Sequence, residues 1–183
     1  MLLATSHWNE LIARYVIDNY SCPFDLVLNG FRDSDIVKRV SDELLRNVES
    51  PPVSTGLYEY LCSLPDHLFN LICFDAESLL AMNPIDQKRL LDEALRVLSP
   101  GGHCTFLIAD GVRSGKIVPK GFQLVHRFLS SRYKVVTIMN EQSSPGLPFQ
   151  LAPHQYLAVF QKPTDRKKQL LRQTTARSRL SLL

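Results

Sequence analysis

The segment that most constrains the fold is residues 64–109, where a short apolar run, an amphipathic stretch and a second apolar run follow one another. The first run, residues 68–74, is too short for a buried helix and has the length of a buried strand. Asn83 precedes a proline and begins a helix, which the Ser-Pro-Gly-Gly sequence of residues 99–102 ends. Residues 104–109 predict a second buried strand. The order strand, helix, strand predicts a parallel crossover unit.

This segment resembles the central portion of class I S-adenosylmethionine-dependent methyltransferases, which typically reads "LP-x-x-x-FD-hydrophobic" and later "E-x-x-RVL-x-PGG". The matching residues are Leu64-Pro65, 69–72 (FNLI) and 93–102 (EALRVLSPGG). The resemblance implies an α/β, Rossmann-like class I methyltransferase fold with a seven-stranded, mostly parallel sheet and an antiparallel edge strand. Residues 93–102 would form a helix-to-strand turn away from the cofactor, so they indicate the fold and not the activity.

The rest of the chain fits one such domain over residues 1–162, followed by a tail at residues 163–183. Strands are expected at residues 2–5, 24–28, 53–60, 68–74, 104–109, 133–140 and 156–161. Helices are expected at residues 8–19, 34–48, 83–98 and 122–130, and loops at residues 111–121 and 143–153. The first strand is assigned to residues 2–5 because a start at Phe24 would leave too few residues before Leu68 for the two usual intervening units.

The family implies a cofactor site at the turn after the first strand, the end of the second and the turn after the fourth. The first turn is usually glycine-rich, because the backbone must pass close to the ligand. Residues 4–10 contain no glycine and include Trp8. The second strand usually ends in an acid that binds the ribose hydroxyls, and Asn29 lies nearest that position here. Asp75 supplies an acid just past the fourth strand.

The resemblance therefore implies a degraded cofactor site. If S-adenosylmethionine binds, the expected contacts are Ser6, His7, Asn29 and Asp75. Each has a structural alternative, because residues 5–7 can cap the following helix and Asp75 can cap a helix or be solvated at a strand-to-helix turn.

Other chemistry finds little support in the sequence. The histidines are scattered without metal-ligand spacing, so no metal site is expected. The segment 111–117 is one residue short of a phosphate-binding loop and lacks Ser or Thr after its lysine. No serine lies in a nucleophile-elbow sequence, and no catalytic residue is assigned. Three of the four cysteines lie in or beside predicted strands, which indicates buried free thiols in a reducing compartment.

Charge is distributed unevenly along the chain. Seven of the 21 basic residues and one of the 18 acidic residues lie from Lys162 onward, so the remainder carries a net charge of about −3. The tail could bind nucleic acid or an acidic protein face, although without interleaved aromatic residues a solvated arm or linker is favoured. No apolar run has membrane-spanning length and the amino terminus lacks signal-peptide features, so a soluble, cytoplasmic protein is expected.

The leading interpretation is a non-catalytic methyltransferase-like domain that binds no cofactor and serves as a scaffold or protein-interaction module. It is similar to the amino-terminal domain of the anamorsin family, which implies a role in iron–sulfur assembly, although this chain lacks that family's cysteine-rich module. Two alternatives stay open. The chain could be an active S-adenosylmethionine-dependent methyltransferase with a divergent cofactor loop, or the inactive subunit of a methyltransferase heterodimer.

Overall fold

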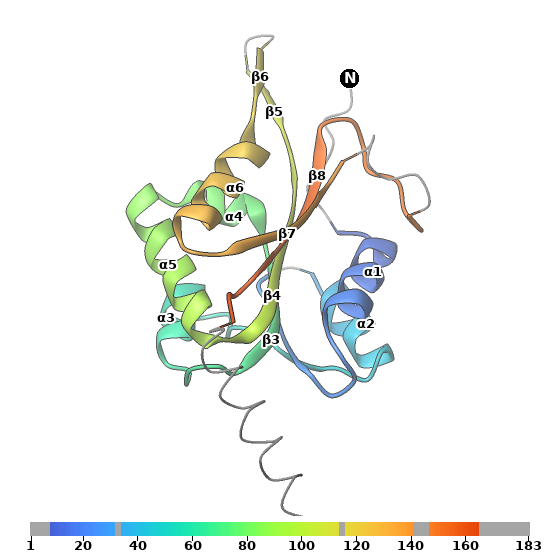
Figure 1. Ribbon diagram of the computed structural model, residues 1–183, viewed down its shortest axis with the longest axis vertical. Coiled ribbons are helices and arrows are strands. Elements are labelled where there is room, and N and C mark those ends of the chain that lie inside the picture. Colours follow the sequence, from blue (N-terminus) through green and yellow to red (C-terminus); the bar gives the residue numbers. More distant parts are fainter. Residues whose placement is uncertain (1–7, 32–33, 114–115, 141–146, 165–183) are drawn as a thin grey trace, which may run out of the picture.

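The computed structural model describes residues 8–31, 34–113, 116–140 and 147–164, in which helices and strands form an α/β fold (Figure 1). The helices are α1 (Glu10–Tyr20), α2 (Ile36–Glu43), α3 (Leu57–Cys62), α4 (Ala76–Ala81), α5 (Pro84–Val97) and α6 (Lys120–Ser130). The strands are β1 (Leu26–Asn29), β2 (Asn47–Glu49), β3 (Phe69–Phe74), β4 (Leu98–Ala109), β5 (Gly111–Arg113), β6 (Lys116–Val118), β7 (Lys134–Met139) and β8 (Gln155–Gln161).

The main sheet has the strand order β2-β1-β3-β4-β8-β7. The first four strands are parallel, and β8 runs antiparallel between β4 and β7. The mostly parallel α/β sheet with an antiparallel edge is confirmed. The described part of the chain holds six strands of this sheet rather than seven, while β5 and β6 form a separate hairpin where a loop was expected.

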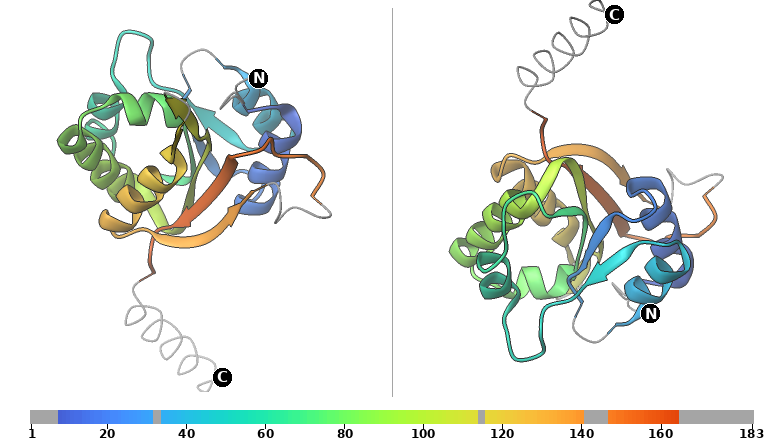
Figure 2. Two further views of the ribbon diagram at one scale, coloured as in Figure 1. Left: turned by 90° about the horizontal axis from the view of Figure 1, so that it is seen from above. Right: turned by 90° about the horizontal axis from the view of Figure 1, so that it is seen from below.

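Helices cover both faces of the sheet, with α1 and α2 on one side and α3 to α6 on the other (Figures 1 and 2). Side chains alternate between two cores, as the period of a strand requires. In β3, for example, Leu71 and Cys73 join the core under α1 and α2, whereas Ile72 and Phe74 join the core under the other helices. Burial on both faces explains why residues 71–74 of this strand are all apolar in the sequence.

The predicted crossover unit is confirmed as β3, α5 and β4. The Asn83 side chain accepts hydrogen bonds from the backbone N–H groups of Ile85 and Asp86, both at 3.0 Å, and so caps α5 at its amino end. Strand β4 begins at Leu98, six residues earlier than expected, because Leu98 pairs with Phe69 of β3. No helix of the described residues could span a membrane.

The expected strand at residues 53–60 is wrong, since helix α3 forms there. Pro51 and Pro52 have no backbone N–H to donate to a ladder, and the backbone is extended at Gly56 before the helix begins. Leu57 and Leu61, four residues apart, then lie on one helix face and pack into the core.

This correction changes which strand of the expected fold each observed strand corresponds to. The position between β2 and β3 belongs to β1, the strand that was expected to be second. The expected first strand at residues 2–5 lies outside the described residues. The first strand was assigned to residues 2–5 because two further units were expected between Phe24 and Leu68. Among the described residues, only one strand, β2, forms between β1 and β3.

Two of the four cysteines are buried and two are exposed, whereas three buried thiols were expected. Cys73 and Cys104 are free and buried, and burial raises the pKa of both thiols well above its usual value. Cys22 and Cys62 are also free but lie on the surface. Cys62 was expected beside a strand and is instead the last residue of helix α3, on its exposed face.

The expected helix at residues 34–48 ends early, at Glu43. Leu45 adopts a left-handed conformation with φ of 60°, and the N–H of Arg46 donates to the carbonyl of Ser41 at 2.8 Å. The N–H of Leu45 donates to the carbonyl of Asp42 at 3.2 Å. These two bonds form a Schellman turn, in which glycine usually occupies the left-handed position. The turn redirects the chain into β2.

We expect Leu45→Gly to raise the free energy of unfolding by about 1 kcal/mol, because glycine adopts this conformation without the Cβ penalty. Urea denaturation would measure the change. Leu44→Gly is the matched control, because Leu44 has φ of −92° and gains nothing from glycine. Equal destabilisation by both substitutions would contradict the prediction.

Candidate functional site

The connections of the central strands reverse direction between β1 and β3. From β1 the chain crosses to β2 on one side, and then returns to place β3 on the other side of β1. In open α/β sheets such a switch point leaves a crevice outside the carboxyl ends of the strands, where ligands usually bind.

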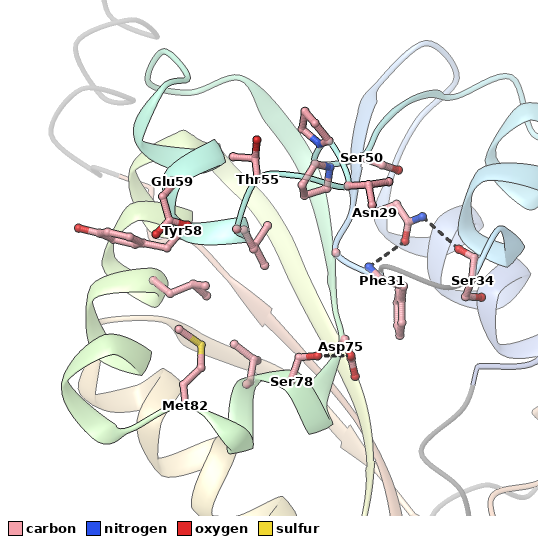
Figure 3. A pocket seen from close by; sticks show the side chains of 18 of the residues that line it. Asn29, Phe31, Ser34, Ser50, Thr55, Tyr58, Glu59, Asp75, Ser78 and Met82 are labelled. Carbon is pink, nitrogen blue, oxygen red and sulfur yellow. Dashed lines mark hydrogen bonds between the residues drawn. The ribbon is translucent and has the colours of Figure 1, made fainter.

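A cavity of about 940 Å³ lies at this point (Figure 3). Its walls come from the turn after β1, the segment 50–59 after β2, helix α4 and the first half of α5. The volume is within the range of small-molecule and cofactor sites in proteins. The switch point therefore carries a preformed, ligand-sized site.

Gly30 lets β1 and β3 approach closely at the base of the cavity. Its N–H donates to the carbonyl of Cys73 at 2.9 Å, and a Cβ at this position would lie 2.6 Å from the same oxygen. No side chain fits in that space. The turn after β1 thus contains a glycine that the contact between β1 and β3 requires, and Phe31 follows it.

Asn29 lines the cavity, as expected for a contact residue, but its amide stabilises the turn. Its Oδ1 accepts from the N–H of Phe31 and its Nδ2 donates to the carbonyl of Ser34, both at 3.2 Å. The side chain is 3% exposed. Asn29 therefore fixes the path of the backbone around the cavity (Figure 3).

Asp75 also lines the cavity, which brings two of the predicted contact residues into one site. Its carboxylate caps α4, because Oδ1 accepts from the N–H of Glu77 at 3.2 Å and Oδ2 accepts from the Ser78 hydroxyl. This is the capping role considered as the structural alternative. Ser6 and His7 lie outside the described residues and stay predicted contacts.

Trp8 does not line the cavity, contrary to the expectation that it would occupy the cofactor turn. It precedes α1, is 7% exposed, and packs edge-on against the ring of Phe31 at a centroid distance of 5.4 Å. Phe31 itself lines the cavity. Trp8 thus packs against a residue that lines the cavity without lining the cavity itself.

Glu49 was missed by the sequence reasoning. It is the last residue of β2, where an acid was sought and where Asn29 was considered instead. The Tyr60 hydroxyl donates to Glu49 Oε2 at 2.6 Å, and burial together with this bond raises the pKa of Tyr60 well above its usual value. The polar pair Arg46-Asn47, which interrupts the helical pattern before Val48, is the signal that could have located β2.

Carboxylates dominate the charge of the cavity. Asp35, Glu59, Asp75 and Asp86 line it together with one guanidinium, that of Arg89. A cleft with an excess of one charge attracts ligands of the opposite charge. This lining favours a ligand that carries a positive charge. Among the described residues no group of His, Cys, Asp and Glu side chains could hold a metal ion.

Comparison with known proteins identifies the fold. No family model and no curated protein matches the chain. A Burkholderia thailandensis 1,6-didemethyltoxoflavin-N1-methyltransferase, solved with bound S-adenosylhomocysteine, aligns with a TM-score of 0.59 and 13% identity over 84% of this chain and 77% of its own. A SAM-dependent methyltransferase from Aquifex aeolicus aligns with a TM-score of 0.58 and 12% identity over 83% and 90%.

A SAM-dependent methyltransferase from Archaeoglobus fulgidus gives a TM-score of 0.54 and 12% identity over 84% and 94%. The chain has the fold of class I methyltransferases. A Thermus thermophilus structure, of which this chain covers 54%, has a TM-score of 0.46 and supports no argument. Identities this low show the fold alone.

Within the methyltransferase fold, β1, β2 and β3 take the places of the first, second and fourth strands. The third strand is replaced by residues 50–56 and α3, so the segment that forms one cavity wall stands where a strand was expected. With this assignment of strands, the cavity lies beside the turn after β1, the end of β2 and the turn after β3, which are the three positions expected from the resemblance.

We predict that Gly30→Ala lowers the free energy of unfolding by about 1–3 kcal/mol, because the new methyl group would overlap the Cys73 carbonyl and force the strands apart. Urea denaturation gives the value. In Gly111→Ala the methyl group meets the flexible Lys120 side chain at 3.2 Å and makes an ordinary contact with Val118 Cβ at 3.8 Å, so the change should stay within about 0.5 kcal/mol. A Gly30→Ala protein as stable as this control would refute the prediction.

Proposed function

We propose that this chain is an S-adenosylmethionine-dependent methyltransferase with a divergent cofactor loop. The observation that supports the proposal is the cavity at the switch point, bounded by the carboxyl ends of β1, β2 and β3. One objection based on the sequence loses its force with the corrected strand assignment, because the turn after β1 contains Gly30 rather than Trp8. Strand β2 ends in an acid, Glu49, but its carboxylate accepts from the Tyr60 hydroxyl and does not line the cavity.

The proposed cofactor contacts are the backbone at Gly30, the polar groups of Asn29, Ser50 and Asp75, and the predicted residues Ser6 and His7. The cationic sulfonium and the ammonium group of the cofactor suit a cavity in which most of the charged lining residues are carboxylates. The apolar side chains of Leu79, Met82 and Leu90 offer surface for a purine ring.

Methyl transfer requires little covalent chemistry from the protein. A lone pair of the acceptor forms the new bond to the methyl carbon, and the carbon–sulfur bond breaks with its electrons going to sulfur, which leaves neutral S-adenosylhomocysteine. The protein mainly holds donor and acceptor close and in line. The absence of an assigned acid or base is therefore compatible with the reaction.

A second candidate is a non-catalytic module that uses the fold to bind a protein partner. It is favoured by the turn after β1, where Phe31 follows the glycine and the Asn29 amide is already hydrogen-bonded. The anamorsin-like role in iron–sulfur assembly and the heterodimer subunit belong with this candidate. Binding of nucleic acid through the basic tail, residues 163–183, is a further proposal.

Calorimetric titration with S-adenosylmethionine and S-adenosylhomocysteine separates the two candidates. We expect micromolar binding by the parent protein and a loss of about tenfold or more in Ser50→Trp, because the indole would fill the cavity. Ser54→Trp is the matched control, because Ser54 belongs to the same segment but does not line the cavity.

Binding by the parent and by Ser54→Trp, with loss in Ser50→Trp, would support the cofactor site. Transfer of a labelled methyl group to an acceptor would then identify the substrate. Absence of binding by the parent would exclude the methyltransferase and favour the non-catalytic module.

A further inference from the structure

The hydrogen bond between Tyr60 and Glu49 joins the two residues that flank the segment 50–59. Glu49 is the last residue of β2, Tyr60 lies in α3, and residues 50–59 connect them. The donor–acceptor distance is 2.6 Å, and both side chains are partly buried. Hydrogen bonds to a charged group are among the stronger ones in proteins.

The enclosed segment forms much of the cavity. Nine of the ten residues from 50 to 59 line it, all except Ser54. Neither Glu49 nor Tyr60 lines the cavity. The bond therefore acts on the site only through the segment that it closes.

The segment has few other attachments. Pro51 and Pro52 cannot donate backbone hydrogen bonds, and the N–H of Thr55 donates within the segment, to the carbonyl of Pro52 at 2.9 Å. Among the described residues, the only hydrogen bond from residues 50–56 to another element is the first bond of α3, from the N–H of Tyr60 to the carbonyl of Gly56 at 3.0 Å. Val53 at its tip is 97% exposed. Packing of α3 and the bond at the base are what hold this wall in place.

We propose that Glu49 and Tyr60 form a clasp that fixes residues 50–59 as a wall of the cavity. Both are positioning residues, and they act on ligand affinity by limiting the motion of the segment. The identity of the ligand rests on the proposed function, whereas the clasp itself does not.

Two measurements on the full chain test the clasp. The first is amide hydrogen exchange of residues 50–59 in the absence of ligand, and the second is affinity for S-adenosylhomocysteine. The variants are Tyr60→Phe, Glu49→Ala and the double variant. Tyr133→Phe is the matched control, because it removes a buried hydroxyl that donates to the Leu91 carbonyl at 3.0 Å, away from this segment.

We expect faster exchange in residues 50–59 and about tenfold weaker affinity in both single variants, the size of effect that loss of one such bond gives. The double variant should be no worse than either single variant, because the bond can be lost only once. Glu49→Gln keeps an acceptor and should recover most of the affinity. Tyr133→Phe should leave exchange in the segment unchanged.

Unchanged exchange in residues 50–59 would overturn the clasp. The clasp would also be overturned if Glu49→Ala lost much more affinity than Tyr60→Phe and the two effects added in the double variant. That result would mean that Glu49 contacts the ligand itself. If the parent does not bind S-adenosylhomocysteine, the proposed function fails, and the exchange data alone decide the clasp.

Discussion

The close approach of β1 to β3 at Gly30 is the constraint on which the site depends. The bond from Gly30 N–H to the Cys73 carbonyl joins two strands that lie 40 or more residues apart in the sequence. It places the carboxyl end of β1 beside that of β3, while the chain between them runs out to β2 and back. That path creates the switch point, and with it the cavity. A side chain at Gly30 would oppose the pairing itself.

The cavity owes its shape to a departure from the usual fold. A strand was expected at residues 53–60, and here the wall is formed by residues 50–56 and the first turn of α3. Irregular backbone at a site has to be held by side chains or by packing. The Glu49 and Tyr60 pair and the buried face of α3 supply both. The site thus depends on local contacts of this chain, which are added to the sheet that the fold shares with other proteins.

The sequence predicted best those elements whose signals are local. Strand β3, helix α5 and the core of β4 have lengths, caps and apolar spacing that point to one structure. The predictions for residues 34–48 and 53–60 were wrong for different reasons. In the first, Leu45 takes a left-handed conformation that glycine normally marks. In the second, a segment of mixed polarity was assigned to a strand, and the packing of Leu57 and Leu61 on one helix face decided the structure.

The sequence by itself determined the fold class and the crossover unit, because periodicity and turn residues act over a few positions. It also identified Asn29 and Asp75, which the structure brings to one cavity. Only the tertiary structure decided which strand is central, because strand order depends on pairings between distant segments. It likewise decided the roles of Glu49 and Tyr60, since a hydrogen bond across eleven residues follows from how β2 and α3 pack and has no sequence signature.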